Sequence, residues 1–422
     1  MLQRVSRLVL PPLLVIAALA VYRISLAIAG GSRPDQRITA PSLAPRRIAP
    51  TRNEPAVVTD EQLWQVLDRV KPTRDPVNTN NFVHALRLWG ASADFGDPRI
   101  PTGRQMRDYL LDDGVFQQFA GSQAPPLFTR GPAGVEARPY EISGAHRATS
   151  SYHLDDLLAT LAETGVPLDT PMQLRDGQAQ VSELLDDSLR RFYLQRQEFE
   201  WSMICYIRYL FPTPEWRNKY GEKINLAGIV DDLVNHPLEK GPCDGLHRLE
   251  AAVLLLRADE QTPALPPQLR KYLKAYLKRT SDLLVQAQAR DGYWSIGWSR
   301  GVSPEQIAKS ATESAGPADQ PAATVDRKLS PAPKLHDKLL VTGHHLEWLA
   351  LAPDDLQPPR EAVVRAGQWL ARTLLEMDGK QLHEAYGPYS HAARALCLWR
   401  SREPFEFWRA GRPTPDQTNA SN

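Results

Sequence analysis

The stretch "GLHRLEAAVLLL", residues 245–256, decides the fold. It is apolar on almost every face of a helix, and a helix with this character is buried. Two later stretches are alike: "HHLEWLALA" at 344–352 and "SHAARALCLW" at 390–399. Each of the three carries a histidine near its start, so the chain repeats one kind of buried helix at long intervals.

Amphipathic segments lie between these buried helices. Their apolar residues recur at spacings of three and four, and no sustained alternating run predicts a strand. Thr59 with Gln62, and Thr102 with Gln105, fit the capping box that opens a helix. We predict twelve helices, at 60–71, 81–92, 103–113, 153–164, 181–194, 197–211, 226–235, 245–257, 267–288, 340–352, 359–376 and 388–400.

The helices alternate in character along the chain. The odd members have one charged face, whereas several even members are apolar all round. Six exposed and six buried helices in alternation predict an all-α fold, an α/α toroid of about six helical hairpins. The inner helices of such a ring run in the same direction, so their N-termini open at one mouth. The two longest connections, 114–152 and 289–339, lead into inner helices and are expected at that mouth.

The N-terminus predicts export. A basic leader precedes an apolar run from Leu8 to Tyr22. The segment is either a cleaved signal peptide or a retained transmembrane anchor, and both place the body on the extracytoplasmic side. Residues 31–57 are rich in proline and lack periodicity, which indicates a flexible tether. The predicted organisation is an anchor or signal at 1–30, the tether at 31–57, a toroid domain at 58–409 with a mobile loop at 300–335, and a disordered tail at 410–422.

Bulk composition excludes several classes of partner. The 50 basic and 49 acidic residues nearly balance, so no global field attracts nucleic acid. Three cysteines are too few for a disulfide framework. The sequence has no Gly-rich phosphate loop and no serine nucleophile elbow. We therefore expect no nucleic-acid partner and no cofactor, with the membrane as partner through the N-terminal helix.

A short motif in "QAQARDGYWSIGW", residues 286–298, resembles a known repeat. Gln288, Gly292 and Trp294 reproduce the Gln-x3-Gly-x-Trp core of the QW repeat of squalene and other terpenoid cyclases. Those enzymes, and the related prenyltransferase β subunits, are α/α toroids. The resemblance implies a structural role for Gln288 and Trp294, tying the end of an outer helix to the next unit. The cyclase acid motif Asp-x-Asp-Asp is absent from the sequence, so the resemblance implies no cyclase chemistry.

A second stretch resembles the N-acylglucosamine and cellobiose 2-epimerases, which are also α/α barrels. Their helices carry Gly-His-x-x-Glu, matched here by Gly343, His344 and Glu347, and a late Pro-Tyr-His. In this chain Ser390 separates Pro388-Tyr389 from His391, which departs from that pattern. The resemblance implies a carbohydrate-like substrate class.

Histidine–glutamate pairs are the candidate catalytic groups. His247 with Glu250, and His344 with Glu347, stand three residues apart and so share a helix face. An imidazole beside a carboxylate forms a general acid–base unit, and we add His391 to this set. The alternative is that each histidine caps its helix or bonds a loop carbonyl while each glutamate pairs with an arginine.

Histidines and aromatic residues near the other inner helix starts are candidate ligand-binding groups. Flat apolar faces beside histidine and glutamate suit a carbohydrate-like or polymeric ligand. The alternatives are a non-catalytic binding or scaffold toroid, with the aromatic residues closing the hydrophobic core, and an isoprenoid-handling enzyme. The predicted ligand-binding residues are His84, His153, Glu200, Trp294, Trp298, Trp348 and Tyr389.

Metal binding is a further alternative. Cys243 and His247 are four residues apart, and His344 or His391 would supply a third ligand across the mouth, leaving a tetrahedral zinc one open position. The sequence has no CxxC and no HExxH motif, so we predict no metal centre and keep these residues as a candidate set. The other interpretation of Cys243 is a free thiol packed at a helix start.

Overall fold

The computed structural model describes residues 40–411, apart from 41, 74–77, 132–133, 139–143, 145, 214, 237, 239–241, 308, 310–333 and 385. They belong to one compact unit, Ala40–Asn422. The predicted anchor or signal at 1–30, most of the loop at 300–335 and nearly all of the tail lie outside the described residues. Among the described residues, no helix has the length and hydropathy needed to cross a membrane.

The described part of the chain is mostly helical, as the apolar periodicity predicts, and all twelve predicted helices are present. Both predicted capping boxes form, at Thr59 and at Thr102. Six of the helices are buried over most of their length, and one of them, α8, is buried at every residue. These are α3 (Thr79–Trp89), α6 (Asp156–Glu163), α8 (Phe199–Tyr209), α10 (Leu246–Gln261), α13 (Leu335–Leu351) and α16 (Tyr386–Trp399).

The other six helices bury one face and expose the other, which is how an amphipathic sequence packs against a core. They are α2 (Asp60–Arg69), α4 (Gly103–Leu111), α7 (Val181–Arg191), α9 (Leu226–Asn235), α11 (Pro267–Ala287) and α14 (Arg360–Glu376). Short helices also occur in the described part of the chain, among them α5 (Asp113–Ala120), α15 (Gly379–Glu384) and α17 (Pro404–Arg409). Helices this short lack the repeated turns from which periodicity is read.

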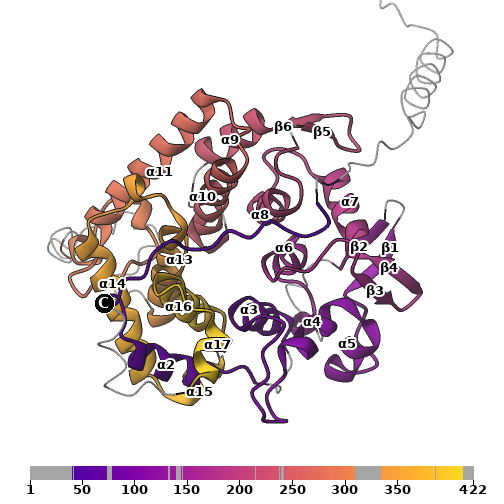
Figure 1. Cartoon of the computed structure of the whole chain (residues 1–422), viewed down its shortest axis with the longest axis horizontal. Helices are drawn as coiled ribbons and strands as arrows, with labels where there is room; N and C mark the ends of the chain where they lie inside the picture. The colour runs from indigo at the N-terminus through magenta and orange to yellow at the C-terminus, as the bar shows by residue number, and fades with distance from the viewer. Residues whose placement is uncertain are drawn as a thin grey trace, which may run out of the picture. The chain divides into compact units, whose positions relative to one another are not determined.

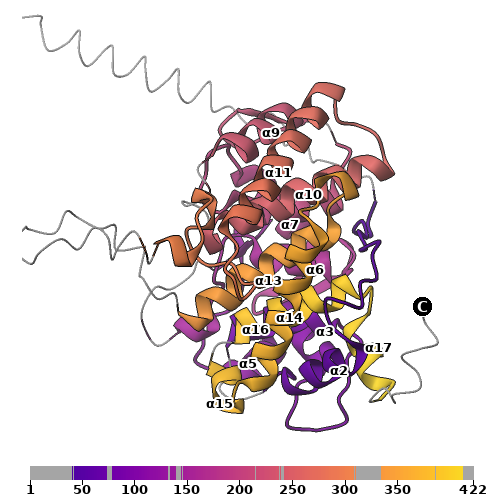
Figure 2. The ribbon, with the colours of Figure 1, turned by 90° about the vertical axis from the view of Figure 1, so that its left-hand side faces the viewer.

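The buried helices contact one another in a cyclic order. α3 contacts α6, and contacts then follow from α6 to α8, α10, α13 and α16. α16 returns to α3, so the order closes (Figure 1). The amphipathic helices lie on the outside of this order; α14, for example, packs against α13 and α2 (Figure 2).

Residues 42–57, predicted as part of the tether, are instead bonded to the domain. We call them the strap. The backbone N–H of Arg46 donates to Arg208 O (2.7 Å), and that of Glu54 donates to Trp399 O (2.9 Å). Between these points the strap also bonds residues near the ends of α10 and α13. An extended segment needs no periodicity to pack, so composition alone does not distinguish a strap from a free tether.

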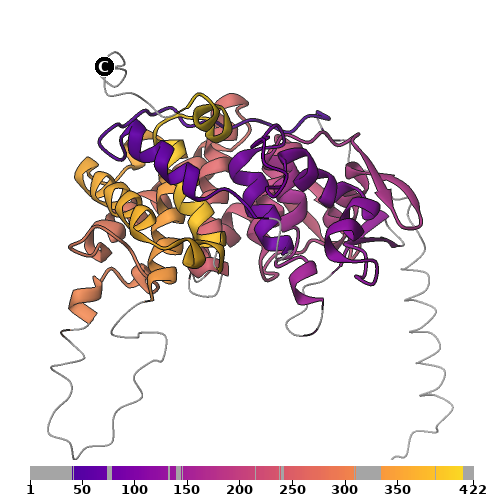
Figure 3. The same cartoon turned by 90° about the horizontal axis from the view of Figure 1, so that it is seen from below.

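The strap's hydrogen bonds show in which direction four of the inner helices run. Its partners lie in the last turns of four of them: Arg208 in α8, Gln261 in α10, Leu349 in α13 and Trp399 in α16. These four helices therefore end at the same face, which the indigo segment crosses in Figure 1 and borders in Figure 3. Their N-terminal halves point to the opposite face.

The expectation of no strands is wrong. Within the described residues three antiparallel hairpins form, each of two short strands. Strands of three or four residues do not show the alternation that identifies a strand in a sequence. The pairs are β1 (Phe128–Gly131) with β2 (Gly134–Ala137), β3 (Pro171–Leu174) with β4 (Gly177–Gln180), and β5 (Glu215–Arg217) with β6 (Lys223–Asn225).

Gln288 and Trp294 join the end of α11 to its surroundings. The side-chain amide of Gln288 donates to Gly292 O (2.8 Å) and to Ala362 O on α14 (2.7 Å). The indole N–H of Trp294 donates to Leu284 O (2.9 Å). Both side chains are buried, so these bonds satisfy carbonyls that water does not reach.

Replacing Gln288 with alanine should destabilise the domain. Two buried carbonyls would lose their donor, which costs about 1–3 kcal/mol. Urea unfolding followed by circular dichroism measures this change in the free energy of unfolding. Gln286→Ala is the matched control, because Gln286 is exposed and should change stability little. Equal stabilities of the two variants would contradict the bonding role.

Candidate functional site

Four imidazole rings from four different helices meet inside the ring of buried helices. We call His84 (α3), His247 (α10), His344 (α13) and His391 (α16) the histidine cluster. The ring centroids of His344 and His391 are 3.8 Å apart, those of His247 and His344 4.5 Å, and those of His84 and His391 4.8 Å. The four histidines do converge, but the predicted position at inner helix starts is wrong for His84 and His344, which lie in the middle of α3 and α13 because these helices begin earlier than predicted. His247, His344 and His391 are buried and do not line an open mouth.

Close packing of α13 against α16 brings two of these rings together. A Cβ on Gly343 would lie 2.9 Å from the backbone nitrogen of Ala392. Only glycine leaves room for that approach. As a result the next residue, His344, meets His391 of the facing helix.

Glu347 holds both of these imidazoles. Its Oε2 accepts from Nδ1 of His344 (3.1 Å) and from Nδ1 of His391 (2.9 Å). Its Oε1 accepts from Nη1 of Arg394 (2.9 Å). On the neighbouring ring, Glu250 Oε2 lies 3.6 Å from Nδ1 of His247. Both predicted histidine–glutamate pairs are thus adjacent, and Glu347 links two histidines rather than one.

A layer of buried charges lies behind the cluster. Arg87 pairs with Glu163 (2.5 Å), and Arg394 bonds the same carboxylate (3.1 Å) and approaches Glu250 (3.7 Å). Arg208 also faces Glu163 (3.6 Å). These arginines and Glu163 were not among the predicted site residues. The available signal was a lone charged residue inside each otherwise apolar helix, as in "HALRLW" and "ICYIRYL".

The hydrogen-bond partners of His84 and His391 show which ring nitrogen of each carries the proton. Nδ1 of His84 lies 2.7 Å from the carbonyl of Asn80, which only accepts, so this nitrogen donates. Nδ1 of His391 likewise donates to Glu347. The two Nε2 atoms then face each other at 3.1 Å. The lone pairs of two imidazoles therefore meet at this contact.

Cys243 lies beside the cluster, in the short 3₁₀ turn η3 (Pro242–Gly245) that leads into α10. It is half-buried, whereas Cys205 and Cys397 are buried. Burial raises the pKa of the Cys243 thiol, but the neighbouring His247 and His344 outweigh burial and hold it well below its ordinary value. The donor atoms of Cys243, His247 and His344 lie within 4.8 Å of one another, and so do those of His344, Glu347 and His391.

The environment pushes the pKa values of the cluster apart. Burial, followed by the charge of His344, lowers the pKa of His247 to about 4. Burial also opposes the charged form of His344, yet Cys243 and Glu347 raise its pKa to about 9. Burial and the nearby Arg87 lower the pKa of His84 to about 3. Neutral and charged imidazoles therefore stand side by side.

His153 lies at the edge of the cluster. Its ring stacks on Trp201, with centroids 5.6 Å apart, and Trp201 in turn lies 4.1 Å from His247. Nδ1 of His153 bonds Glu198 (3.1 Å). Burial opposes the charge on His153, but Glu198 and Asp156 outweigh it and raise the pKa to about 9. Trp201 was not among the predicted site residues, although it opens an inner helix with a buried indole.

The other predicted ligand-binding residues lie elsewhere or contribute to packing. Glu200 is buried and pairs with Arg248 (2.9 Å). Trp294, Trp298 and Trp348 are buried around His345, which accepts from the indole N–H of Trp348 (3.1 Å). Tyr389 is buried on α16. The three tryptophans thus surround His345 and do not line the cluster.

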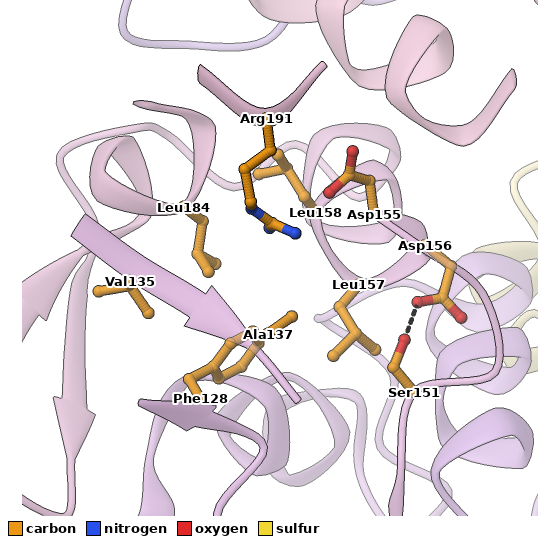
Figure 4. Close-up of a pocket in the computed structure, with 10 residues that line it drawn as sticks. All are labelled: Phe128, Val135, Ala137, Ser151, Asp155, Asp156, Leu157, Leu158, Leu184 and Arg191. Carbon is orange, nitrogen blue, oxygen red and sulfur yellow. Dashed lines mark hydrogen bonds between the residues drawn. The ribbon is translucent and has the colours of Figure 1, made fainter. Parts of the chain in front are cut away.

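A small pocket lies away from the cluster, between β2, α6 and α7 (Figure 4). Its polar residues are engaged within the protein. Asp155 accepts from Arg196 (2.6 Å) and Ser188 (2.7 Å), whereas Asp156 accepts from Ser151. The adjacent aspartates therefore point to different partners, and the pocket has the character of a structural cleft.

No protein-family model, curated protein or solved structure matches the chain. The candidate site therefore rests on its own geometry, with five of the predicted residues (His247, Glu250, His344, Glu347 and His391) in one connected network.

Glu198→Gln should destabilise the domain at pH 6 but not at pH 10. The pKa of His153 is raised from 6.5 to about 9, so its pairing with Glu198 contributes fully below pH 6.5 and is lost as pH rises through 9. The pair is partly exposed, so we expect about 0.5–1 kcal/mol at pH 6. Urea unfolding at both pH values measures it. The control is Glu260→Gln, whose partner is an arginine rather than a histidine, so its effect should be the same at both pH values.

Proposed function

We propose that the chain is a membrane-tethered, envelope-facing α/α toroid whose histidine cluster is the catalytic centre of an enzyme acting on a glycan polymer. The closed contact order of the six buried helices supports the toroid. The common direction of α8, α10, α13 and α16 supports it as well.

One observation carries the catalytic proposal: four imidazoles from four helices meet ring to ring, with carboxylates behind them. Stability alone does not favour this arrangement, because burying charged groups costs free energy that a well-packed apolar core avoids. Helix caps are also usually Ser, Thr, Asp or Asn rather than His. A cluster that is costly and spread over separate elements is the usual mark of a functional site.

His391 and Glu347 are the proposed proton-transfer pair. Glu347 fixes the tautomer of His391 by accepting from Nδ1, and this leaves Nε2 toward His84. His84 is half-buried and so lies nearest to solvent among the cluster. A positioned imidazole of this kind contributes about 10²–10⁴-fold to a proton-transfer step.

The ligand class rests on the resemblance of Gly343, His344 and Glu347 to the helix motif of the 2-epimerases. The tryptophans first considered as sugar platforms surround His345 instead, so they supply no support for a glycan. The alternative of a non-catalytic binding or scaffold toroid involves the same residues without proton transfer. Product formation distinguishes the two.

The test incubates the full chain with purified peptidoglycan and with soluble oligosaccharides prepared from it. Mass spectrometry of the soluble products measures turnover, and co-sedimentation measures binding. His391→Asn should lower the rate at least 100-fold with binding retained. His236→Asn is the matched control, because His236 directly follows α9, pairs with Asp232 and is not part of the histidine cluster.

Two outcomes would overturn the catalytic proposal. Binding without product, unchanged in His391→Asn, would favour the scaffold alternative. Neither binding nor product would remove the glycan ligand altogether.

Export is the remaining part of the proposal. The basic leader and apolar run within residues 1–30 support it. Alkaline phosphatase fused after residue 57 should be active in a bacterial host, because that enzyme folds only outside the cytoplasm. An inactive fusion, with the fusion protein present at normal amounts, would place the body in the cytoplasm.

A further inference from the structure

We propose that Cys243, His247 and His344 hold one divalent transition-metal ion of the zinc class, with one coordination position open. Their donor atoms come from η3, the first turn of α10 and the middle of α13, yet all lie within 4.8 Å of one another. One thiolate and two imidazoles suit zinc and similar ions rather than magnesium or calcium, which prefer oxygen ligands.

The outer partners of His344 are those of a metal-bound imidazole. A ligating histidine normally donates its other ring N–H to a carboxylate. Nδ1 of His344 donates to Glu347, which is itself held by Arg394. Nε2 of His344 is buried and makes no hydrogen bond within the described part of the chain. A lone pair is thus aimed at the space shared with Cys243 and His247.

His247 repeats the pattern on the facing helix. It is buried, and its Nδ1 makes no hydrogen bond within the described residues, with Glu250 Oε2 3.6 Å away. Buried polar atoms are almost always paired in folded proteins. The rings of His247 and His344 have their centroids 4.5 Å apart beside the thiol of Cys243, so one cation would be within reach of all three side chains.

The backbone directs the thiol toward the two imidazoles. Cys243 has a positive φ of 50°, in a region that a residue with a side chain rarely adopts. Gly245 follows with φ 78°, and a Cβ there would lie 2.5 Å from Leu238 O. Such strained positions persist where the surrounding structure requires them, commonly at functional sites. Cys243 is half-buried, whereas His247 and His344 are buried, so the thiol is the donor group nearest to solvent.

The second group of possible ligands, His344, Glu347 and His391, does not form a separate ion site. The Nδ1 atoms of both histidines already donate hydrogen bonds to Oε2 of Glu347, and Oε1 of Glu347 accepts from Arg394. These atoms therefore already have partners within the protein. Glu347 therefore orients a ligand and does not replace one.

This inference deepens the proposed function and rests on it for its catalytic meaning. Three protein ligands with a free fourth position are typical of catalytic rather than structural zinc. A metal there would polarise a substrate oxygen or bind a water molecule, while His391, held by Glu347, would transfer the proton.

The experiment measures metal binding by the full chain, purified under reducing conditions without a polyhistidine tag. Elemental analysis after equilibration with zinc should give about one zinc per chain. Cobalt(II) titration should add the absorption of a thiolate-bound, tetrahedral cobalt ion. Cys243→Ser should abolish that band, and His344→Gln should abolish one-to-one binding. Glu347→Gln should weaken the affinity about 10–100-fold.

His236→Gln is the control and should bind as the wild type does, because it alters a histidine that directly follows α9. Circular dichroism shows whether each variant folds. If a ligand variant does not fold, the wild-type cobalt spectrum still decides, because only a bound thiolate gives the charge-transfer band.

Wild-type protein with less than about one tenth of an equivalent of zinc, or cobalt bound without the thiolate band, would overturn the metal site. Glycan turnover that persists in such metal-free protein would leave the proposed function standing. Bound metal with no glycan product would leave the metal site and remove the glycan activity.

Discussion

Glu347 accepts hydrogen bonds from two imidazoles and a guanidinium at the point where α13 and α16 touch. The rest of the site depends on this carboxylate. It fixes the tautomers of His344 and His391, and so decides which ring nitrogens face the centre. Gly343 makes the arrangement possible, because any side chain there would push α16 away.

The charges behind the cluster constrain the whole ring. Glu163 on α6 pairs with Arg87 from α3 and with Arg394 from α16, and Arg208 from α8 faces it as well. This one carboxylate therefore links four inner helices. An uncompensated buried charge costs several kcal/mol. Apolar contacts tolerate many arrangements of six helices, whereas this network requires one order. Specificity for the observed ring therefore comes partly from groups that contribute little net stability.

The sequence predicts long, strongly periodic elements well and side-chain partners poorly. The twelve main helices follow from periodicity and caps, while three- and four-residue strands carry no such pattern. Position within a helix also matters. His344 and His345 are neighbours, but successive residues point roughly 100° apart around a helix. His344 consequently joins the cluster, while His345 and Trp348 form a separate buried group. Sequence spacing shows which residues share a face, but not which neighbour that face meets.

The strap has a consequence for the order in which the protein can fold. Glu54 bonds Trp399, so a segment made early in synthesis takes its final place only after α16, the last inner helix, has formed. Contacts between residues so far apart in sequence slow folding, because the entropy of closing a long loop is lost before the contact contributes any stabilising free energy. The domain therefore does not complete its folding piece by piece as the chain leaves the ribosome. The strap reaches its final position only when α16 is present. Until then, a partly synthesised chain exposes the ends of the inner helices that the strap covers.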